Sequence, residues 1–160
     1  MIIRCCLSLG PQLAVVVAAI MAAVAPVTTV HAQASLDALA TQTPDAMRFL
    51  PDPAHAGYES AVLVGNPAGP GVYAVRTRLP ADVTIAPHTH GEKWRIATVL
   101  SGTLYYAAGD TFDAGKLRAL GPGSLIVEPM GIPHFAMTRG EPVLLHIVGE
   151  GPASTDAVRK

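Results

Sequence analysis

Hydrophobic and polar residues alternate along much of the chain after residue 58. Over 72–79 the odd-numbered positions share one face, while Arg76 and Arg78 lie on the other, which is the period of a half-buried β-strand. Similar short runs, separated by turns rich in Gly and Pro, occur at 60–64, 83–90, 95–100, 103–107, 116–120, 124–128, 134–138 and 143–148. The pattern predicts an all-β antiparallel sandwich or barrel without a long helix.

The first 32 residues follow a different pattern. Arg4 precedes an uninterrupted apolar run over 13–25, which Pro26 ends before the small and apolar residues that lead to Ala32. This run is shorter than the roughly 20 residues of a membrane span, and the whole arrangement is typical of a secretory signal peptide. We expect cleavage after Ala32, or alternatively Ala34, and a secreted or periplasmic product without stable membrane insertion. An uncleaved anchor is the alternative.

The mature chain is expected to contain a single β domain. An irregular, proline-containing arm over 33–57 precedes the barrel over 58–148, and a tail over 149–160 follows it. No internal repeat indicates a second barrel. Both cysteines, Cys5 and Cys6, lie in the leader, so the mature chain would have neither disulfides nor thiolate chemistry.

Composition and charge narrow the class of partner. The chain is 50% hydrophobic and 14% charged, which is enough apolar material for a buried core. Its formal net charge is −1, and no basic block occurs along it. A nucleic-acid-binding surface is therefore excluded as the main function, and a small-molecule ligand is expected instead.

Three histidines have the spacing of a metal site. His88 and His90 are two residues apart on one predicted strand, so their side chains point to the same face, about 6.6 Å apart along the chain. His134 begins another strand, 44 residues after His90, and a barrel could bring that strand opposite the first. Three neutral imidazoles predict one divalent transition metal ion, Fe, Mn, Ni, Zn or Cu, with an open coordination position.

Two segments, 87–102 and 123–138, carry motifs of fixed spacing. The first reads Pro-His-x-His and ends on glycine, and the second reads Gly-x5-Pro-x-Gly-x2-His. With the Val-Leu-Ser-Gly turn over 99–102, these motifs resemble those of the cupin superfamily, in particular its small secreted single-domain members. The resemblance covers about 58–148. It implies a cupin-type jelly-roll barrel, a metal held by three histidines and one glutamate, and a homodimer.

The sequence departs from the cupin pattern at three positions. The leading glycine of the first motif is Asp82, its glutamate is Arg95, and the last asparagine of the second motif is Thr138. The fourth metal ligand is therefore missing in register. Three alternatives stay open: a three-histidine site as in cupin thiol and diketone dioxygenases, Glu92 as the fourth ligand, or an inward Arg95 that excludes the metal.

Three residues are predicted to bind the ligand of the barrel: Arg95, Arg76 and Tyr105. A guanidinium can hold a carboxylate through two hydrogen bonds, which suits an acidic molecule. The alternative for Arg76 is a solvent-facing side chain. The alternative for Arg95 is an outward side chain, with Trp94 facing inward, because a register slip of one residue reverses every side chain of a strand. Tyr105 and Tyr106 are adjacent in a strand, so only one of them can face the cavity. His146 is interpreted as structural and His55 as solvent-exposed. Glu128, just before Pro129, is interpreted as an ordinary turn residue, and the alternative is that it accepts a hydrogen bond from a ligand histidine.

These observations predict a secreted metal-binding cupin that binds, or acts on, a small organic and acidic molecule. If it is an enzyme, iron would imply an oxygenase, and a Lewis-acid metal would imply an isomerase, lyase or hydrolase. The alternatives are a non-catalytic sensor of a small molecule or metal, and a structural barrel that has lost its metal. The cupin fold hosts many unrelated activities and does not choose among these.

Overall fold

The computed structural model describes residues 34, 36–37, 39–53 and 55–159 of the 160-residue chain. The predicted signal peptide, 1–32, lies outside the described residues and stays a prediction. Within the described part, the regular structure is eleven strands and two short 3₁₀ helices, η1 (Pro44–Ala46) and η2 (Ala114–Lys116). None of the helices in this part is long and apolar enough to cross a membrane. The expected all-β class is confirmed.

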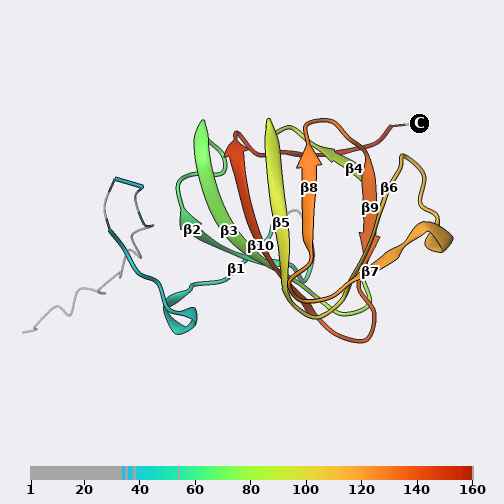
Figure 1. The fold of residues 1–160 in the computed structure, drawn as a ribbon, viewed down its shortest axis with the longest axis horizontal. Helices are drawn as coiled ribbons and strands as arrows, with labels where there is room; N and C mark the ends of the chain where they lie inside the picture. Colours follow the sequence, from blue (N-terminus) through green and yellow to red (C-terminus); the bar gives the residue numbers. More distant parts are fainter. Residues whose placement is uncertain (1–33, 35, 38, 54, 160) are drawn as a thin grey trace, which may run out of the picture. The chain divides into compact units, whose positions relative to one another are not determined.

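The strands form two antiparallel sheets. The first sheet has six strands, of which β3, β10, β5 and β8 stand side by side in Figure 1. Its strands in spatial order are β1 (Leu50–Pro51), β2 (Glu59–Val64), β3 (Gly71–Leu79), β10 (Val143–Gly151), β5 (Trp94–Ser101) and β8 (Leu125–Pro129). The second sheet has five strands: β11 (Thr155–Ala157), β4 (Thr84–His90), β9 (His134–Met137), β6 (Leu104–Ala108) and β7 (Arg118–Leu120).

From β3 onward, the chain passes from one sheet to the other at every connection except that between β6 and β7. β3 belongs to the first sheet, β4 to the second, β5 to the first and β6 to the second, and the alternation resumes from β8 to β11. Most neighbouring strands of these two sheets are consequently far apart in sequence, as in a jelly-roll barrel. The two motif segments thereby meet, because β4 and β9 pair directly.

Inward-facing residues of both sheets form the core. In β10 the odd positions Val143, Leu145 and Ile147 are buried, and the even positions between them are partly exposed. The same parity holds in β3, where Tyr73 and Leu79 are buried. This alternation confirms the face predicted for 72–79 and places Arg76 and Arg78 on the outer face.

Two of the residues that depart from the cupin pattern, Asp82 and Thr138, form hydrogen bonds at the turn that precedes β4. Asp82 adopts φ +58°, the left-handed conformation that a glycine at this position would adopt without strain, and its Oδ1 accepts a hydrogen bond from the Gly140 N–H. The hydroxyl of Thr138 donates to the Pro80 carbonyl and accepts from the Val83 N–H, at 2.7 and 3.1 Å. Aspartate and threonine therefore hold β9 to the turn that precedes β4.

The segment expected to be a tail joins the second sheet. β11 pairs with β4 and places Thr155 opposite His90 and Ala157 opposite His88. The carbonyl oxygen of Ser154, just before β11, lies 3.0 Å from the Nδ1 atom of His90. The end of the chain therefore supports the strand that carries two of the three predicted metal ligands.

Candidate metal centre

Two neighbouring strands bring the three predicted histidines together. His88 and His90 lie on β4, and His134, the first residue of β9, pairs directly with His88. Each histidine offers one nitrogen, and these three nitrogens all lie within 4.8 Å of one another. The i, i+2 spacing on β4 and the antiparallel pairing with β9 produce this convergence.

Backbone carbonyls fix the orientation of all three imidazoles. Each Nδ1 atom lies within hydrogen-bond distance of a carbonyl oxygen, which can only accept, so each Nδ1 carries the proton. The acceptors of His88, His90 and His134 are Ala86, Ser154 and Ile132, at 2.8, 3.0 and 3.0 Å. Each Nε2 atom is consequently left with a lone pair directed at the other two histidines.

The Nε2 atoms have the environment that a cation would complete. Those of His90 and His134 are buried and have no hydrogen-bond partner within the described residues. Burial, reinforced by Arg95, lowers the pKa of His90 to about 4, and burial lowers the pKa of His88 as well. These two imidazoles are therefore neutral at neutral pH, which is the form that binds a metal. The residues fit a divalent transition metal.

A carboxylate stands next to this group. Glu128, on β8, is 5% exposed, and its Oε1 atom lies 3.3 Å from Nε2 of His134. Burial raises the pKa of Glu128, but the neighbouring guanidinium of Arg95 outweighs this effect, so the pKa lies below its usual value. The interpretation of Glu128 as an ordinary turn residue is wrong. Its position, one residue before the Pro-x-Gly turn, is the sequence feature that indicates a place beside the histidines.

Arg95 points into the barrel, where two carboxylates surround it. Its Nε atom forms an ion pair with Glu128, and its Nη1 atom lies 4.0 Å from Glu92. Glu92 is only 2% exposed and accepts a 2.6 Å hydrogen bond from the hydroxyl of Tyr73. The group of converging metal-ligand atoms does not include Glu92, so this arrangement does not support the alternative in which Glu92 is the fourth ligand.

The structure corrects the placement of two predicted ligand-binding residues. Tyr106, and not Tyr105, lines the cavity, and its ring stacks on His134 at 5.3 Å, whereas the Tyr105 ring lies under Arg139. Arg76 lies on the outer face, where its Nη1 atom contacts the sulfur of Met47. Parity explains both corrections, because adjacent strand residues face opposite sides.

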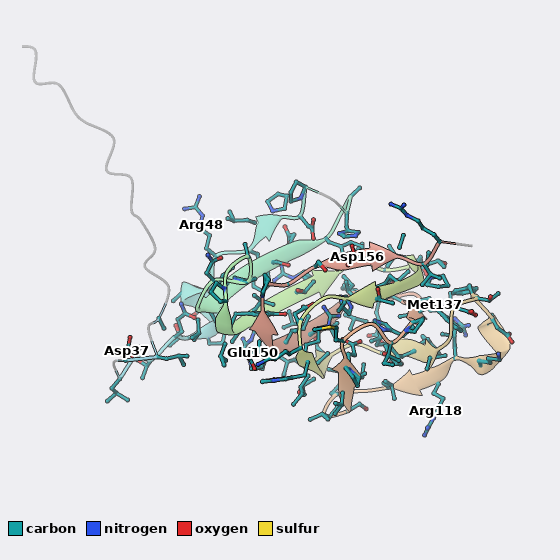
Figure 2. The ribbon with its side chains drawn as sticks, turned by 90° about the horizontal axis from the view of Figure 1, so that it is seen from above. Asp37, Arg48, Arg118, Met137, Glu150 and Asp156 are labelled. Atoms are coloured by element: carbon teal, nitrogen blue, oxygen red, sulfur yellow. The ribbon has the colours of Figure 1, made fainter. Side chains whose placement is uncertain are left out.

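Most other arginines also point outward. Figure 2 shows the side chains of Arg48 and Arg118 directed away from the strands, and both residues are exposed. Among the described residues that line the cavity, Arg95 is the only lysine or arginine. The positive charge in the cavity thus comes from the side chain of Arg95, whereas the outward arginines lie on the surface of the protein.

A cavity of about 170 Å³ lies inside the barrel and contains the three histidines in its wall. Arg95, Glu128 and Tyr106 line it on the same side. Aliphatic residues of both sheets form much of the remaining wall, among them Leu79, Ile85, Leu104, Ile126, Leu145 and Ile147. The site is therefore a small, mostly apolar chamber with one strongly polar region, the usual character of a small-molecule site.

Comparison with known proteins was made by sequence and by structure. No family model and no curated protein sequence matches the chain. The barrel is similar to the polyketide cyclase RemF from Streptomyces resistomycificus, with a TM-score of 0.62 and 18% identity over 77% of this chain and 87% of that one. It is also similar to an RmlC-like cupin from Shewanella frigidimarina, with a TM-score of 0.54 and 14% identity over 71% and 93% of the two chains.

The chain has the cupin fold. KdgF from Halomonas sp. shares this fold as well, with a TM-score of 0.55 and 16% identity over 71% of this chain and 96% of KdgF. At such identities the likeness concerns the architecture alone. In this chain the histidines of both motifs are in place, and the position of the motif glutamate is occupied by Arg95.

Proposed function

We propose that this cupin binds one divalent transition metal through Nε2 of His88, His90 and His134. The observation that carries the proposal is the orientation of the imidazoles: each Nδ1 is held by a backbone carbonyl, and each Nε2 faces the other two. Among the described residues, the buried Nε2 atom of His90 has no hydrogen-bond partner, and that of His134 faces only the carboxylate of Glu128. A buried acceptor without a donor is costly, and a metal ion would satisfy both.

The buried charges around the three histidines favour binding of a metal ion. Once the metal is bound, they favour an acidic ligand. The buried charged side chains around the histidines are the carboxylates of Glu92 and Glu128 and the guanidinium of Arg95, a sum of −1. A divalent cation would change this sum to +1, which then favours an anion. Arg95 is already engaged by the two carboxylates. The metal, and not Arg95 alone, would therefore attract the carboxylate of a small organic acid.

The metal would supply Lewis-acid or redox chemistry at its open coordination positions. The aliphatic wall of the cavity would limit access of water to the centre, and Glu128 holds an acidic group beside it. Iron, manganese, nickel, zinc and copper all accept imidazole ligands, and the identity of the metal decides between oxygenation and isomerase or lyase chemistry. A metal sensor would need only the binding step.

Elemental mass spectrometry of the mature protein tests the proposal. We would express the chain from Gln33 without a metal-binding tag and compare it with a His88→Ala/His134→Ala variant. His146→Ala is the matched control, since His146 lies on the outer face. The proposal predicts about one metal ion per chain in the wild type and control, and none in the double variant. Absence of metal after refilling with each ion would identify a barrel that has lost its metal.

The location and assembly of the protein belong to the same proposal. The apolar run over 13–25 supports secretion, which fractionation of cells that express the full chain would test.

A homodimer is supported by β8, an edge strand with Leu125 and Val127 on its outer face. These two side chains are 60% and 59% exposed to solvent. Sedimentation should show a dimer that Val127→Lys dissociates, and a monomeric wild type would contradict this assembly.

A further inference from the structure

The cavity is polar at two ends. One end carries the candidate metal centre. The other end is lined by five polar side chains of the β1–β2 loop, β2 and β3: Asp52, His55, Tyr58, Ser60 and Thr77. His55 is thus part of the cavity wall and is also exposed to solvent, as its place in the irregular arm predicted. This second end has no role in holding the metal.

The register of the first sheet separates the two ends. Arg95 pairs with Gly149, which pairs with Tyr73, so these three residues are level. Thr77 lies four residues farther along β3, which corresponds to roughly 13 Å. The level between them is aliphatic: Val75, Ile147, Ala97 and Ile126. A ligand that reaches from one end to the other would therefore need an apolar middle.

Local contacts hold the second end in place. The Oδ2 atom of Asp52 lies 3.2 Å from Nδ1 of His55, and the His55 ring stacks on Tyr58 with 5.3 Å between centroids. The backbone N–H of Asp52 donates to the Tyr58 carbonyl at 2.9 Å. The hydroxyls of Ser60 and Thr77 lie 3.1 Å apart. The Asp52 contact with Nδ1 leaves Nε2 of His55 available to a ligand.

The two ends differ in charge. Arg95 is the only lysine or arginine among the described residues of the cavity wall, and it stands at the metal end. The second end carries the carboxylate of Asp52 and the ring of Tyr58. A carboxylate attracts a hydrogen-bond donor and repels another carboxylate, and an aromatic face attracts a cation. The second end therefore suits an ammonium or hydroxyl group of a ligand.

We propose that the cavity binds a small ω-amino or ω-hydroxy carboxylic acid. Its carboxylate would lie at the metal end, its methylene groups along the aliphatic wall, and its amino or hydroxyl group against Asp52 and His55. The cavity volume of about 170 Å³ restricts this ligand to a short chain. The inference rests on the proposed function, because the metal supplies the positive charge of the first end.

Calorimetric titration of the metal-loaded protein tests this ligand class. Four five-carbon probes share the chain length and differ at one end: pentanoate, 5-hydroxypentanoate, 5-aminopentanoate and glutarate. The amino and hydroxy acids should bind roughly tenfold more tightly than pentanoate, as expected for one charge-assisted hydrogen bond, and glutarate should bind no better than pentanoate. The two favoured probes separate a preference for a cation from a preference for any donor.

Substitutions at the second end test whether Asp52 and His55 cause the preference for the amino and hydroxy acids over pentanoate. Asp52→Asn keeps the size of the side chain and should reduce the preference for the amino and hydroxy acids to within about twofold, without weakening pentanoate. His55→Gln should reduce it as well. Asp45→Asn removes an exposed carboxylate of η1 and should leave it unchanged.

Three outcomes would overturn the inference: four probes of equal affinity, a preference that survives Asp52→Asn, or no binding of any probe to protein that retains its metal. Protein that retains no metal refutes the proposed function before this titration begins. The two failures are therefore distinguishable.

Discussion

Arg95 and Glu128 are paired residues on neighbouring strands, and their side chains form an ion pair inside the barrel. In the cupin pattern the position of Arg95 is the one that carries a glutamate. Here the carboxylate stands on the next strand, at the position directly opposite, and it reaches His134. The site thus keeps an acidic group beside its histidines and adds a guanidinium that holds this group.

Replacing Arg95 tests the role of this ion pair. Arg95→Met leaves the buried carboxylates of Glu92 and Glu128 without their cation. We expect the free energy of unfolding of the metal-free protein to fall by about 3 kcal/mol, the usual cost of breaking a buried pair. Urea unfolding measures this change, and added metal should restore more stability to the variant than to the wild type.

The matched control is Arg118→Met, because Arg118 is exposed on β7. It should change the free energy of unfolding by less than about 0.5 kcal/mol. A metal-free Arg95→Met variant as stable as the wild type would show that the ion pair contributes nothing to the fold.

Tyr73 is expected to position Glu92. Its hydroxyl donates a 2.6 Å hydrogen bond to the buried carboxylate of Glu92. Tyr73→Phe removes this donor and should lower the free energy of unfolding by about 2 kcal/mol, as for other hydrogen bonds to charged groups. Tyr105→Phe is the control, and chemical unfolding of both variants is the measurement. Equal stability of the two variants would contradict the role given to Tyr73.

Thr138 is expected to stabilise the turn before β4 through its hydroxyl. Thr138→Val leaves the Pro80 carbonyl and the Val83 N–H without their partner, and each such group costs about 1–3 kcal/mol when buried. Thr138→Ser keeps the hydroxyl and should retain most of the stability. Thermal unfolding distinguishes the two. A serine variant as unstable as the valine variant would assign the effect to packing instead.

The metal-free protein should lose stability in mild acid. Burial, with Arg95, lowers the pKa of His90 to about 4, whereas an unfolded histidine titrates near 6.5. Between these values the unfolded state binds more protons, so the free energy of unfolding falls as the pH decreases from about 6.5 to 4.5. Unfolding in the presence of a chelator at several pH values measures this slope. His90→Gln should flatten it, and an equal slope in the variant would contradict the assignment.

The strands were predictable because the barrel buries one face of each. Alternation located β2 to β9 to within two residues, and β10 except for its last three residues, with turns at Gly and Pro between the strands. β11 was not predicted. It is three residues long and fully exposed in its burial pattern, so it has no apolar periodicity, and its pairing with β4 depends on the tertiary structure.

The parts of the site that were predictable are those in which sequence spacing alone determines which side chains share a face of a strand. His88, His90 and His134 follow from the motifs, because i, i+2 residues share a face. The direction of Arg95 did not follow, since a slip of one residue reverses every side chain of a strand. The same uncertainty of parity led to Tyr105 in place of Tyr106. The burial of Glu92 depends on Tyr73, 19 residues away, and no local pattern reports it.

Anomalous diffraction from crystals of the metal-loaded mature protein tests the central claim most directly. Data collected above and below the absorption edge of the bound metal locate that metal without reference to any activity. The account predicts one anomalous peak per chain, about 2.1 Å from Nε2 of His88, His90 and His134. A peak at other residues, or hydrogen-bonded water in place of a metal between these three nitrogens, would contradict it.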